Sequence, residues 1–159
     1  MKITLVCVGK IKMQYITEGI RDFAGRIAPY ARLEILEIAD EKIPQNPTNG
    51  EIKNILEYEG AKIEKYLAAD SHKIALCIQG KQTDSIKFAQ TIANLQTFGT
   101  SKLTFIIGGS LGLAESVVKS CQMQLSLSKM TFPHQLTRLI LLEQIYRAFR
   151  IINNEPYHK

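Results

Sequence analysis

The 159-residue chain has no tryptophan, only three cysteines, and no apolar run near the roughly 20 residues that a membrane-spanning helix needs. Cys7, Cys77 and Cys121 are odd in number and widely spaced, which fits neither a disulfide framework nor a zinc site. Each lies in or beside an apolar run, so we expect buried, reduced thiols, no bound metal and no membrane partner. Reduced thiols and the lack of a signal-peptide pattern in MKITLVCVGKIK indicate a cytoplasmic protein.

Acidic residues are scarce in the second half of the chain. Residues 1–79 hold 11 Lys or Arg and 11 Asp or Glu, whereas residues 80–159 hold 9 and 4, so the whole net charge of +5 lies in the second half. Such asymmetry is compatible with an anionic partner such as RNA, and also with charges scattered over a solvated surface.

Short β-branched runs alternate with helical stretches along the chain. Five such strand–helix units predict an α/β fold, a parallel-type sheet flanked by helices on both faces, in a single domain over residues 1–159. The segment DEKIPQNPTNGE, at 40–51, is rich in Pro, Gly and Asn and predicts a loop. Strands are expected at 2–8, 33–39, 73–79, 102–107 and 123–127, and helices at about 13–28, 49–68, 84–97, 112–121 and 136–152.

A glycine turn follows the fourth expected strand, in the segment FIIGGSLGL (105–113). Gly108 and Gly109 would let the backbone approach a ligand, and ligands of open α/β sheets bind outside the carboxyl ends of the strands. The segment is therefore a candidate cofactor turn. A tight strand-to-helix turn with no ligand remains an alternative, because the pattern is neither G-x-G-x-x-G nor a P-loop.

The segment LSLSKMTFPHQ (125–135) joins the last expected strand to the last helix. Loops of this kind can wrap a nucleoside with backbone groups and apolar side chains. Met130 and Phe132 could equally be ordinary packing residues. Pro133 suits a helix start, because proline fixes φ and lacks a donor.

The last expected helix carries an apolar surface that is wide for a helix packed on one side only. Burial between two subunits of a dimer would explain this width, and so would complete burial within one chain. Glu143 and Arg147 are spaced i,i+4 in the favourable order for an ion pair.

The chain ends NNEPYHK, at 153–159, with a phenol, an imidazole and an ammonium side by side. Pro156 prevents the helix from continuing. Tyr157 and His158 could form a proton-accepting pair or a stacking platform for a base, or they could simply be surface residues.

Three segments, FIIGGSLGL, LSLSKMTFPHQLTRLILLEQIYRAF and NNEPYHK, resemble the RlmH family of SPOUT-class methyltransferases, which act on large-subunit ribosomal RNA. The segments MKITLVCVGKIK, EYEGAKI and IALCIQGK are also similar to that family, so the resemblance covers the full chain. In that family the glycine turn often reads Gly-Gly-Pro-Glu-Gly. Here it runs Gly108-Gly109-Ser110-Leu111-Gly112, with no acidic residue.

The resemblance implies a SPOUT methyltransferase fold with a C-terminal trefoil knot, over about 73–159, that holds S-adenosylmethionine. It also implies a homodimer. The implied substrate is a pseudouridine in helix 69 of 23S rRNA, methylated at N3 on the assembled ribosome, with no DNA partner. Implied cofactor-binding residues are Leu76, Gly108, Gly109, Leu127, Ser128, Lys129, Met130, Thr131 and Phe132.

Four residues of the last helix and tail are candidate catalytic groups under this resemblance. His158 is the expected proton acceptor, because neutral imidazole is well poised near neutral pH. Tyr157 would stack on the base or relay the proton, and Arg147 would stabilise the anionic pyrimidine with Glu143 orienting it. In a dimer the tail could act on cofactor held by the other subunit. Rival functions are a SPOUT enzyme acting on tRNA, a non-catalytic ribosome-associated factor and a nucleotide-binding protein unrelated to RNA.

Overall fold

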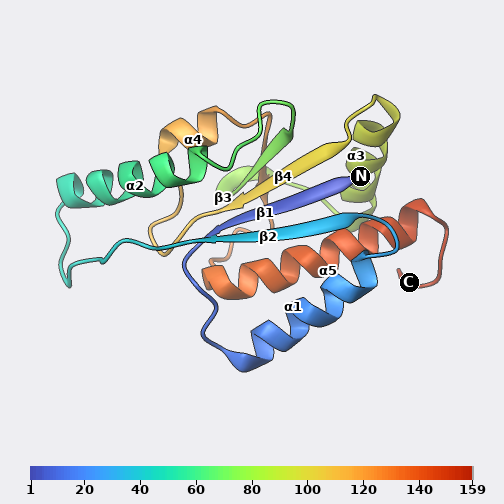
Figure 1. Cartoon of the computed structure of the whole chain (residues 1–159), viewed down its shortest axis with the longest axis horizontal. Coiled ribbons are helices and arrows are strands. Elements are labelled where there is room, and N and C mark those ends of the chain that lie inside the picture. Colours follow the sequence, from blue (N-terminus) through green and yellow to red (C-terminus); the bar gives the residue numbers. More distant parts are fainter. Residues whose placement is uncertain (159) are drawn as a thin grey trace.

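Five short runs of β-branched and apolar residues form one sheet, in the order β2-β1-β4-β3-β5, and every neighbouring pair is parallel (Figure 1). The α/β fold predicted from the sequence is therefore confirmed. The computed structural model describes residues 1–158. The strands are β1 (Lys2–Val8), β2 (Arg32–Ile38), β3 (His72–Gln82), β4 (Lys102–Ile107) and β5 (Met123–Ser126).

Helices cover both faces of the sheet, and Figure 1 shows α1 and α5 on one side with α2 and α4 on the other. One core cluster joins α1, α3 and α5 to the side chains of Ile3, Leu5 and Cys7, whereas Val6 and Val8 face α2 and α4. This alternation is the period of two expected of a strand. The helices are α1 (Gln14–Ile27), α2 (Asn49–Glu64), α3 (Ser85–Thr97), α4 (Glu115–Lys119) and α5 (His134–Ile152).

Local side-chain contacts fix where two helices begin. Thr48 and Glu51 form a capping box at the start of α2, in which each side chain accepts from the other residue's backbone N–H. Asp84 caps α3 by accepting from Lys87 N over 2.7 Å. The expected N-cap at Asp84 is confirmed, and the loop at 40–51 ends at this capping box.

The helix expected at 112–121 is shorter than predicted, because α4 spans only Glu115–Lys119. Gly112 adopts φ +90° and closes a turn with Gly109, so the chain is not helical there. The predicted helix began at Gly112, which belongs to the turn.

The expectation of buried thiols is confirmed for Cys7 and only in part for the other two. Cys7 is buried in β1, and burial raises the pKa of its thiol to about 12. Cys77 and Cys121 are free but half-buried. Cys77 begins an irregularity in β3, where Leu76 and Lys81 both lie opposite Leu125 of β5, so residues 77–80 leave the ladder. The apolar run did not reveal this break.

Much of the wide apolar surface of α5 packs within the chain, against α1 and α3. Six of its apolar or aromatic side chains are buried: Leu141, Leu142, Ile145, Tyr146, Ala148 and Phe149. Leu139, Ile140, Ile151 and Ile152 of the same helix are only half-buried, so both explanations offered for this surface, burial within one chain and burial in a dimer, stay predictions. Within residues 1–158, every helix is too short or too polar to cross a membrane.

Candidate active site

The carboxyl ends of β4, β3 and β5 meet at one edge of the sheet. Leu76 of β3 lies opposite Ile107 of β4 and opposite Leu125 of β5. Because the strands are parallel, the segments that follow them leave the sheet at the same edge. Gly108, directly after Ile107, and Leu127, two residues after Leu125, therefore lie at the edge where Leu76 ends the regular ladder. Three separate segments that the sequence singled out converge here.

The glycine turn, residues 108–112, requires its glycines for steric reasons. A Cβ on Gly108 would lie 2.1 Å from Gly112 O, and one on Gly109 would lie 3.2 Å from Val8 Cγ1. Gly112 N donates to Gly109 O over 3.1 Å. The turn itself thus explains Gly108 and Gly112, whether or not a ligand contacts them.

A buried carboxylate lies behind the glycine turn. Glu59 of α2 is almost fully buried, and a Cβ on Gly109 would lie 3.5 Å from its Oε2. Burial raises the pKa of Glu59, while the N–H of Glu41, which donates to its Oε1 over 2.9 Å, opposes that rise. Glu59 therefore ties the loop after β2 to the back of the glycine turn.

Residues 127–132, which we call the cofactor loop, are shaped by their own hydroxyls. Ser126 Oγ donates to Ser128 O over 2.9 Å, and Met130 N donates to Ser128 Oγ over 3.0 Å. These local bonds fold the loop on itself just before α5. Met130 is left 73% exposed, so it is not a packing residue of the core. Phe132 is half-buried.

A cavity of about 480 Å³ lies between the cofactor loop, the start of α3 and the middle of α5. Its apolar wall includes Leu127, Phe132 and Ile140, and His158 of the tail also lines it. Two of the expected cofactor residues, Leu127 and Phe132, thus share a cavity with an expected catalytic residue. The other expected cofactor residues are not among its lining: Leu76, Gly108, Gly109, Ser128, Lys129, Met130 and Thr131.

The four candidate catalytic residues, Glu143, Arg147, Tyr157 and His158, come together and are called the tail cluster below. Glu143 Oε1 accepts from Arg147 Nη2 at 2.5 Å, from Arg147 Nε at 3.0 Å and from Tyr157 OH at 3.1 Å. The Arg147 guanidinium lies 4.7 Å from the centre of the Tyr157 ring, and its Nη1 lies 3.4 Å from His158 Nδ1. The i,i+4 ion pair expected from the sequence is confirmed.

Tyr157 is a hydrogen-bond donor in this cluster. Its ring packs edge-on against Tyr146, with centroids 4.8 Å apart. Burial raises the pKa of the Tyr157 phenol, and the charge of Glu143 and the hydrogen bond to it raise that pKa further, against a smaller opposing effect of Arg147. The phenol therefore keeps its proton at neutral pH.

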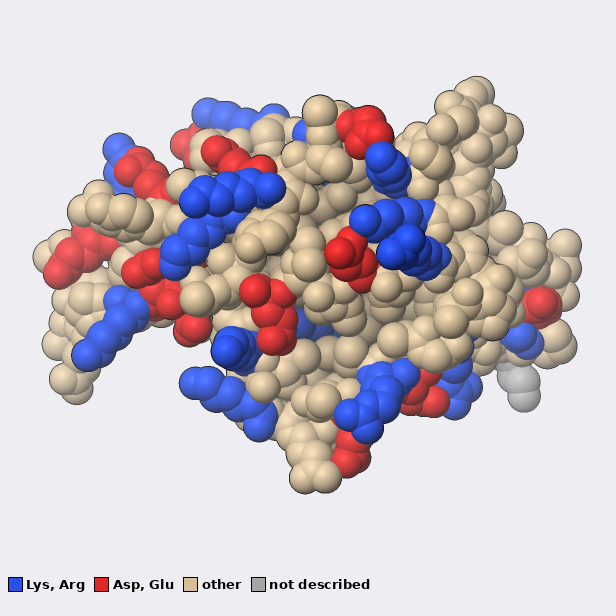
Figure 2. Space-filling model, in the orientation of Figure 1, with Lys and Arg blue, Asp and Glu red and all other residues tan. Residues whose placement is uncertain are grey.

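On one face of the molecule (Figure 2), charge is mixed rather than gathered in one region. On the face shown in Figure 2, Lys and Arg side chains are interspersed with Asp and Glu. At the carboxyl edge of the sheet, exposed lysines follow three of the strands: Lys10 and Lys12 after β1, Lys42 after β2 and Lys129 after β5. Asp40 and Glu41 follow β2 and Asp84 follows β3, so the charge at this edge is mixed as well.

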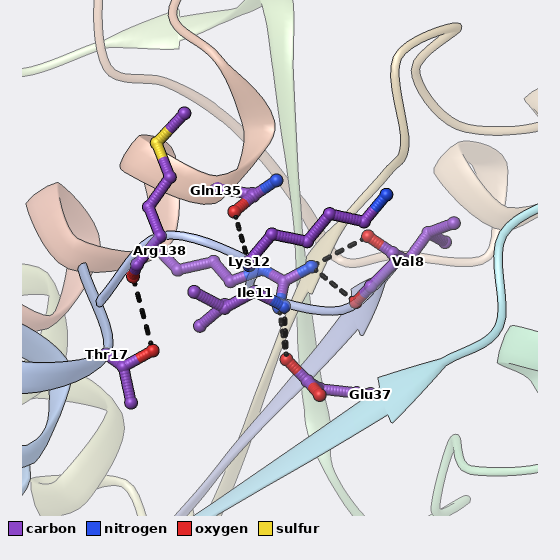
Figure 3. Close-up of polar contacts among 9 residues, drawn as sticks. Val8, Ile11, Lys12, Thr17, Glu37, Gln135 and Arg138 are labelled. Atoms are coloured by element: carbon purple, nitrogen blue, oxygen red, sulfur yellow. Dashed lines mark hydrogen bonds and ion pairs between the residues drawn. The ribbon is translucent and has the colours of Figure 1, made fainter. Parts of the chain in front are cut away.

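Arg138 fastens the start of α5 to the sheet (Figure 3). Its side chain is fully buried and donates to Val8 O and Gly9 O, both over 2.7 Å, and it pairs with Glu37 at 2.8 Å. The same Glu37 oxygen accepts from Ile11 N over 3.1 Å. Arg138 thus joins the carboxyl ends of β1 and β2 to the helix that follows the cofactor loop.

Comparison with known proteins identifies the family. The family model described as "Predicted SPOUT methyltransferase" matches residues 1–158. The chain belongs to the SPOUT methyltransferase family. Two curated proteins named "Ribosomal RNA large subunit methyltransferase H" are similar to this chain. The one from Bacillus cytotoxicus is 49% identical to it and the one from Bacillus cereus 48%, each over 159 residues, which is the full length of this chain and of the relative. A protein of Methanococcus maripaludis, 52% identical over the same span, bears that name in provisional form.

In this SPOUT methyltransferase, sequence reasoning missed three groups around the site. Gln144 lines the cavity, accepts from Ser85 Oγ over 2.7 Å and donates to Glu143 Oε2 over 2.6 Å. Glu59 and Arg138 are buried charges. Nothing near Gln144 in the sequence indicated a role for it, because its hydrogen-bond partner Ser85 lies 59 residues away. A lone Glu or Arg inside an amphipathic helix is read as surface unless its long-range partner is known.

Proposed function

We propose that this SPOUT methyltransferase methylates N3 of a pseudouridine in helix 69 of 23S rRNA, with S-adenosylmethionine as methyl donor and the assembled ribosome as substrate. One observation carries the proposal. His158 of the tail cluster lines the same cavity as Leu127 and Phe132 of the cofactor loop, so an acid–base group stands next to a small-ligand site. The relatives' names support ribosomal RNA as the substrate.

The cavity fits S-adenosylmethionine. Its volume of about 480 Å³ falls within the roughly 300–1,000 Å³ of small-ligand sites, and Leu127 and Phe132 offer apolar walls for a purine. When bound, the cofactor would supply a methyl group already activated by its sulfonium. We assign the binding to Leu127 and Phe132, which line the cavity. Seven further residues, which the resemblance implies and which do not line the cavity, complete the proposed site: Leu76, Gly108, Gly109, Ser128, Lys129, Met130 and Thr131.

The tail cluster would handle the proton of N3, which must leave before the nitrogen lone pair can attack. His158 is our candidate acceptor. A guanidinium only donates hydrogen bonds, so in the Arg147–His158 contact Nδ1 is the acceptor and the ring proton lies on Nε2. For Nδ1 to take the N3 proton, Arg147 has to release it. If Arg147 turns to a pyrimidine carbonyl, one movement frees Nδ1 and stabilises the anion.

Glu143 and Tyr157 would hold Arg147 ready for that movement. Glu143 binds the guanidinium through two nitrogens, and the Tyr157 ring lies against its face. Because the raised pKa keeps Tyr157 protonated, a positioning or stacking role suits it better than proton acceptance.

We further propose the finer features that the resemblance implies. These are one SPOUT domain over residues 1–159, a trefoil knot within about 73–159, a homodimer and a place in the cytoplasm. Within one chain the tail already reaches the cavity beside the cofactor loop. Mixed dimers of a His158→Ala chain and a Phe132→Ala chain address which protomer serves which cavity. A tail that serves its own chain leaves no intact site in such a dimer, whereas a tail that serves the partner leaves one.

The test of the proposed function is methyl transfer from labelled S-adenosylmethionine to intact ribosomes, separated subunits, free rRNA and tRNA offered in parallel. We expect label in 23S rRNA only from assembled ribosomes, mapped to N3 of one pseudouridine, because folded RNA is commonly recognised by its shape rather than by sequence. Label in tRNA would overturn the substrate. No label anywhere, with cofactor binding intact, would favour a non-catalytic factor. Equal rates on free rRNA and ribosomes would contradict recognition of the particle.

A further inference from the structure

The chain reverses direction after α5 and runs back along it. Asn153 N donates to Phe149 O over 3.0 Å, and Asn154 adopts φ +54°, a left-handed conformation that asparagine tolerates better than most residues. Glu155 N then donates to Arg150 O over 2.8 Å. This reversal sends Tyr157 back to Arg147 and Glu143, which lie about 1.4 and 2.5 helical turns before the end of the helix. A terminal segment is ordered in this way only when it is tied down.

Three residues outside the tail cluster, Tyr30, Arg150 and Glu155, hold the tail in place. Arg150 pairs with Glu155 Oε2 at 2.7 Å, donates to Pro156 O over 3.0 Å and donates to Tyr30 OH over 3.1 Å. Tyr30 OH in turn donates to the same Glu155 oxygen. A carboxylate, a guanidinium and a phenol therefore close a triangle around the bend.

Tyr30 anchors the triangle to the body of the protein. It lies between α1 and β2, 120 residues away from Arg150, and its ring stacks on Phe149 with centroids 5.4 Å apart and planes 6° apart. Phe149 is buried in the core, so the phenol is held rigidly. The triangle thus joins the tail to a part of the chain that does not itself touch the cavity.

We propose that Tyr30, Arg150 and Glu155 are positioning residues that hold the tail so that Tyr157 and His158 reach the cavity. The inference rests on the proposed function and deepens it. The tail cluster alone gives His158 only a single 3.4 Å contact to a guanidinium. The triangle fixes the residue just before Pro156, and the proline ring limits the remaining backbone freedom of the tail. Misplacement of an acid–base group by about 1 Å is enough to reduce turnover strongly.

The test compares Glu155→Gln and Tyr30→Phe with a matched control, Glu115→Gln. Glu115 pairs with Lys119 at 2.7 Å on α4, on the opposite face of the sheet, so the control removes an equivalent carboxylate away from the tail. Turnover is measured with saturating ribosomes, cofactor Kd by calorimetry and folding by thermal unfolding. The imidazole NMR signals report on the tail directly, since the chain has only three histidines.

We expect Glu155→Gln to reduce turnover about tenfold, with cofactor Kd changed less than twofold and the His158 ring signals narrowed by added motion. Tyr30→Phe should produce the same pattern more weakly, because Arg150 still holds Glu155. The control should change none of these. Unchanged His158 signals and turnover in both Glu155→Gln and Tyr30→Phe would overturn the proposal, and so would an equal loss in the control. If the parent protein methylates no RNA, the proposed function fails, while the His158 signals still decide whether the triangle orders the tail.

Discussion

The two sides of the site are built by different means. On the cofactor side, backbone turns and apolar walls dominate: Gly108 is fixed by a steric contact, and Met130 points to solvent. On the tail side, three side chains donate hydrogen bonds to the carboxylate of Glu143: Arg147 and Tyr157 to its Oε1, and Gln144 to its Oε2. Side-chain replacement should therefore be tolerated at many cofactor-side positions and at few tail-side positions.

The largest loss of stability is expected from Arg138→Met. This change removes the side chain that joins the helix after the cofactor loop to the carboxyl ends of β1 and β2. The change leaves two backbone carbonyls without their buried donor and removes the partner of the partly exposed Glu37, which costs about 1–3 kcal/mol for each buried acceptor left unpaired. Chemical denaturation should show a lower free energy of unfolding. A loss below about 1 kcal/mol would mean that water replaces the guanidinium.

Arg147→Lys tests the tail side while keeping its charge. Lysine cannot bind Glu143 through two nitrogens or lie flat on the Tyr157 ring. We expect turnover to fall by about 10–100-fold, less than the roughly 10²–10³ for complete loss of a stabiliser of developing charge, because lysine keeps the charge, with little change in cofactor Kd. Full turnover in this variant would show that a positive charge is sufficient there.

Phe132→Ala tests the cofactor side, with Met130→Ala as its control. Phe132 lines the cavity, whereas Met130 is mostly exposed. Loss of an aromatic wall should raise the cofactor Kd about tenfold, and loss of the Met130 side chain should change it less than twofold. Calorimetry measures both. The reverse order would show that the loop rearranges on binding.

Glu59→Gln should give the smallest effect and one that depends on pH. Burial raises the pKa of Glu59 in the folded state, so its contribution to stability is present below the unfolded value of 4.5 and is lost as pH rises through the folded value. Glutamine keeps an acceptor for Glu41 N without the charge. The melting temperature of the variant should therefore gain on the parent as pH rises from 4.5. A constant difference across pH would contradict the raised pKa.

The sequence predicted the fold well because its signals are local. The strand and helix periods, the N-cap at Asp84 and the turn at Gly108 all depend on neighbours within a few residues. The tail cluster was predicted from a family resemblance together with the i,i+4 spacing of Glu143 and Arg147. What could not be predicted depends on distant pairs: Tyr30 meets Glu155, and Arg138 meets Glu37, only after the sheet has formed.

The break in β3 shows the same limit. Residues 77–79 lie within the strand expected at 73–79, yet residues 77–80 leave the ladder. At Gly80 the chain passes so close to the backbone of β5 that a Cβ would lie 2.7 Å from the carbonyl carbon of Leu125. No periodicity in β3 alone encodes that approach.

The central claim is that the tail acts in the chemistry beside the cofactor loop. The direct measurement is single-turnover methylation of assembled ribosomes by the parent and by His158→Ala, with cofactor Kd determined for both. Loss of a general base costs about 10²–10⁴ in rate, so we predict at least a hundredfold slower transfer with an unchanged cofactor Kd. Methyl transfer at the parent rate by His158→Ala would contradict the account and remove His158 from the mechanism.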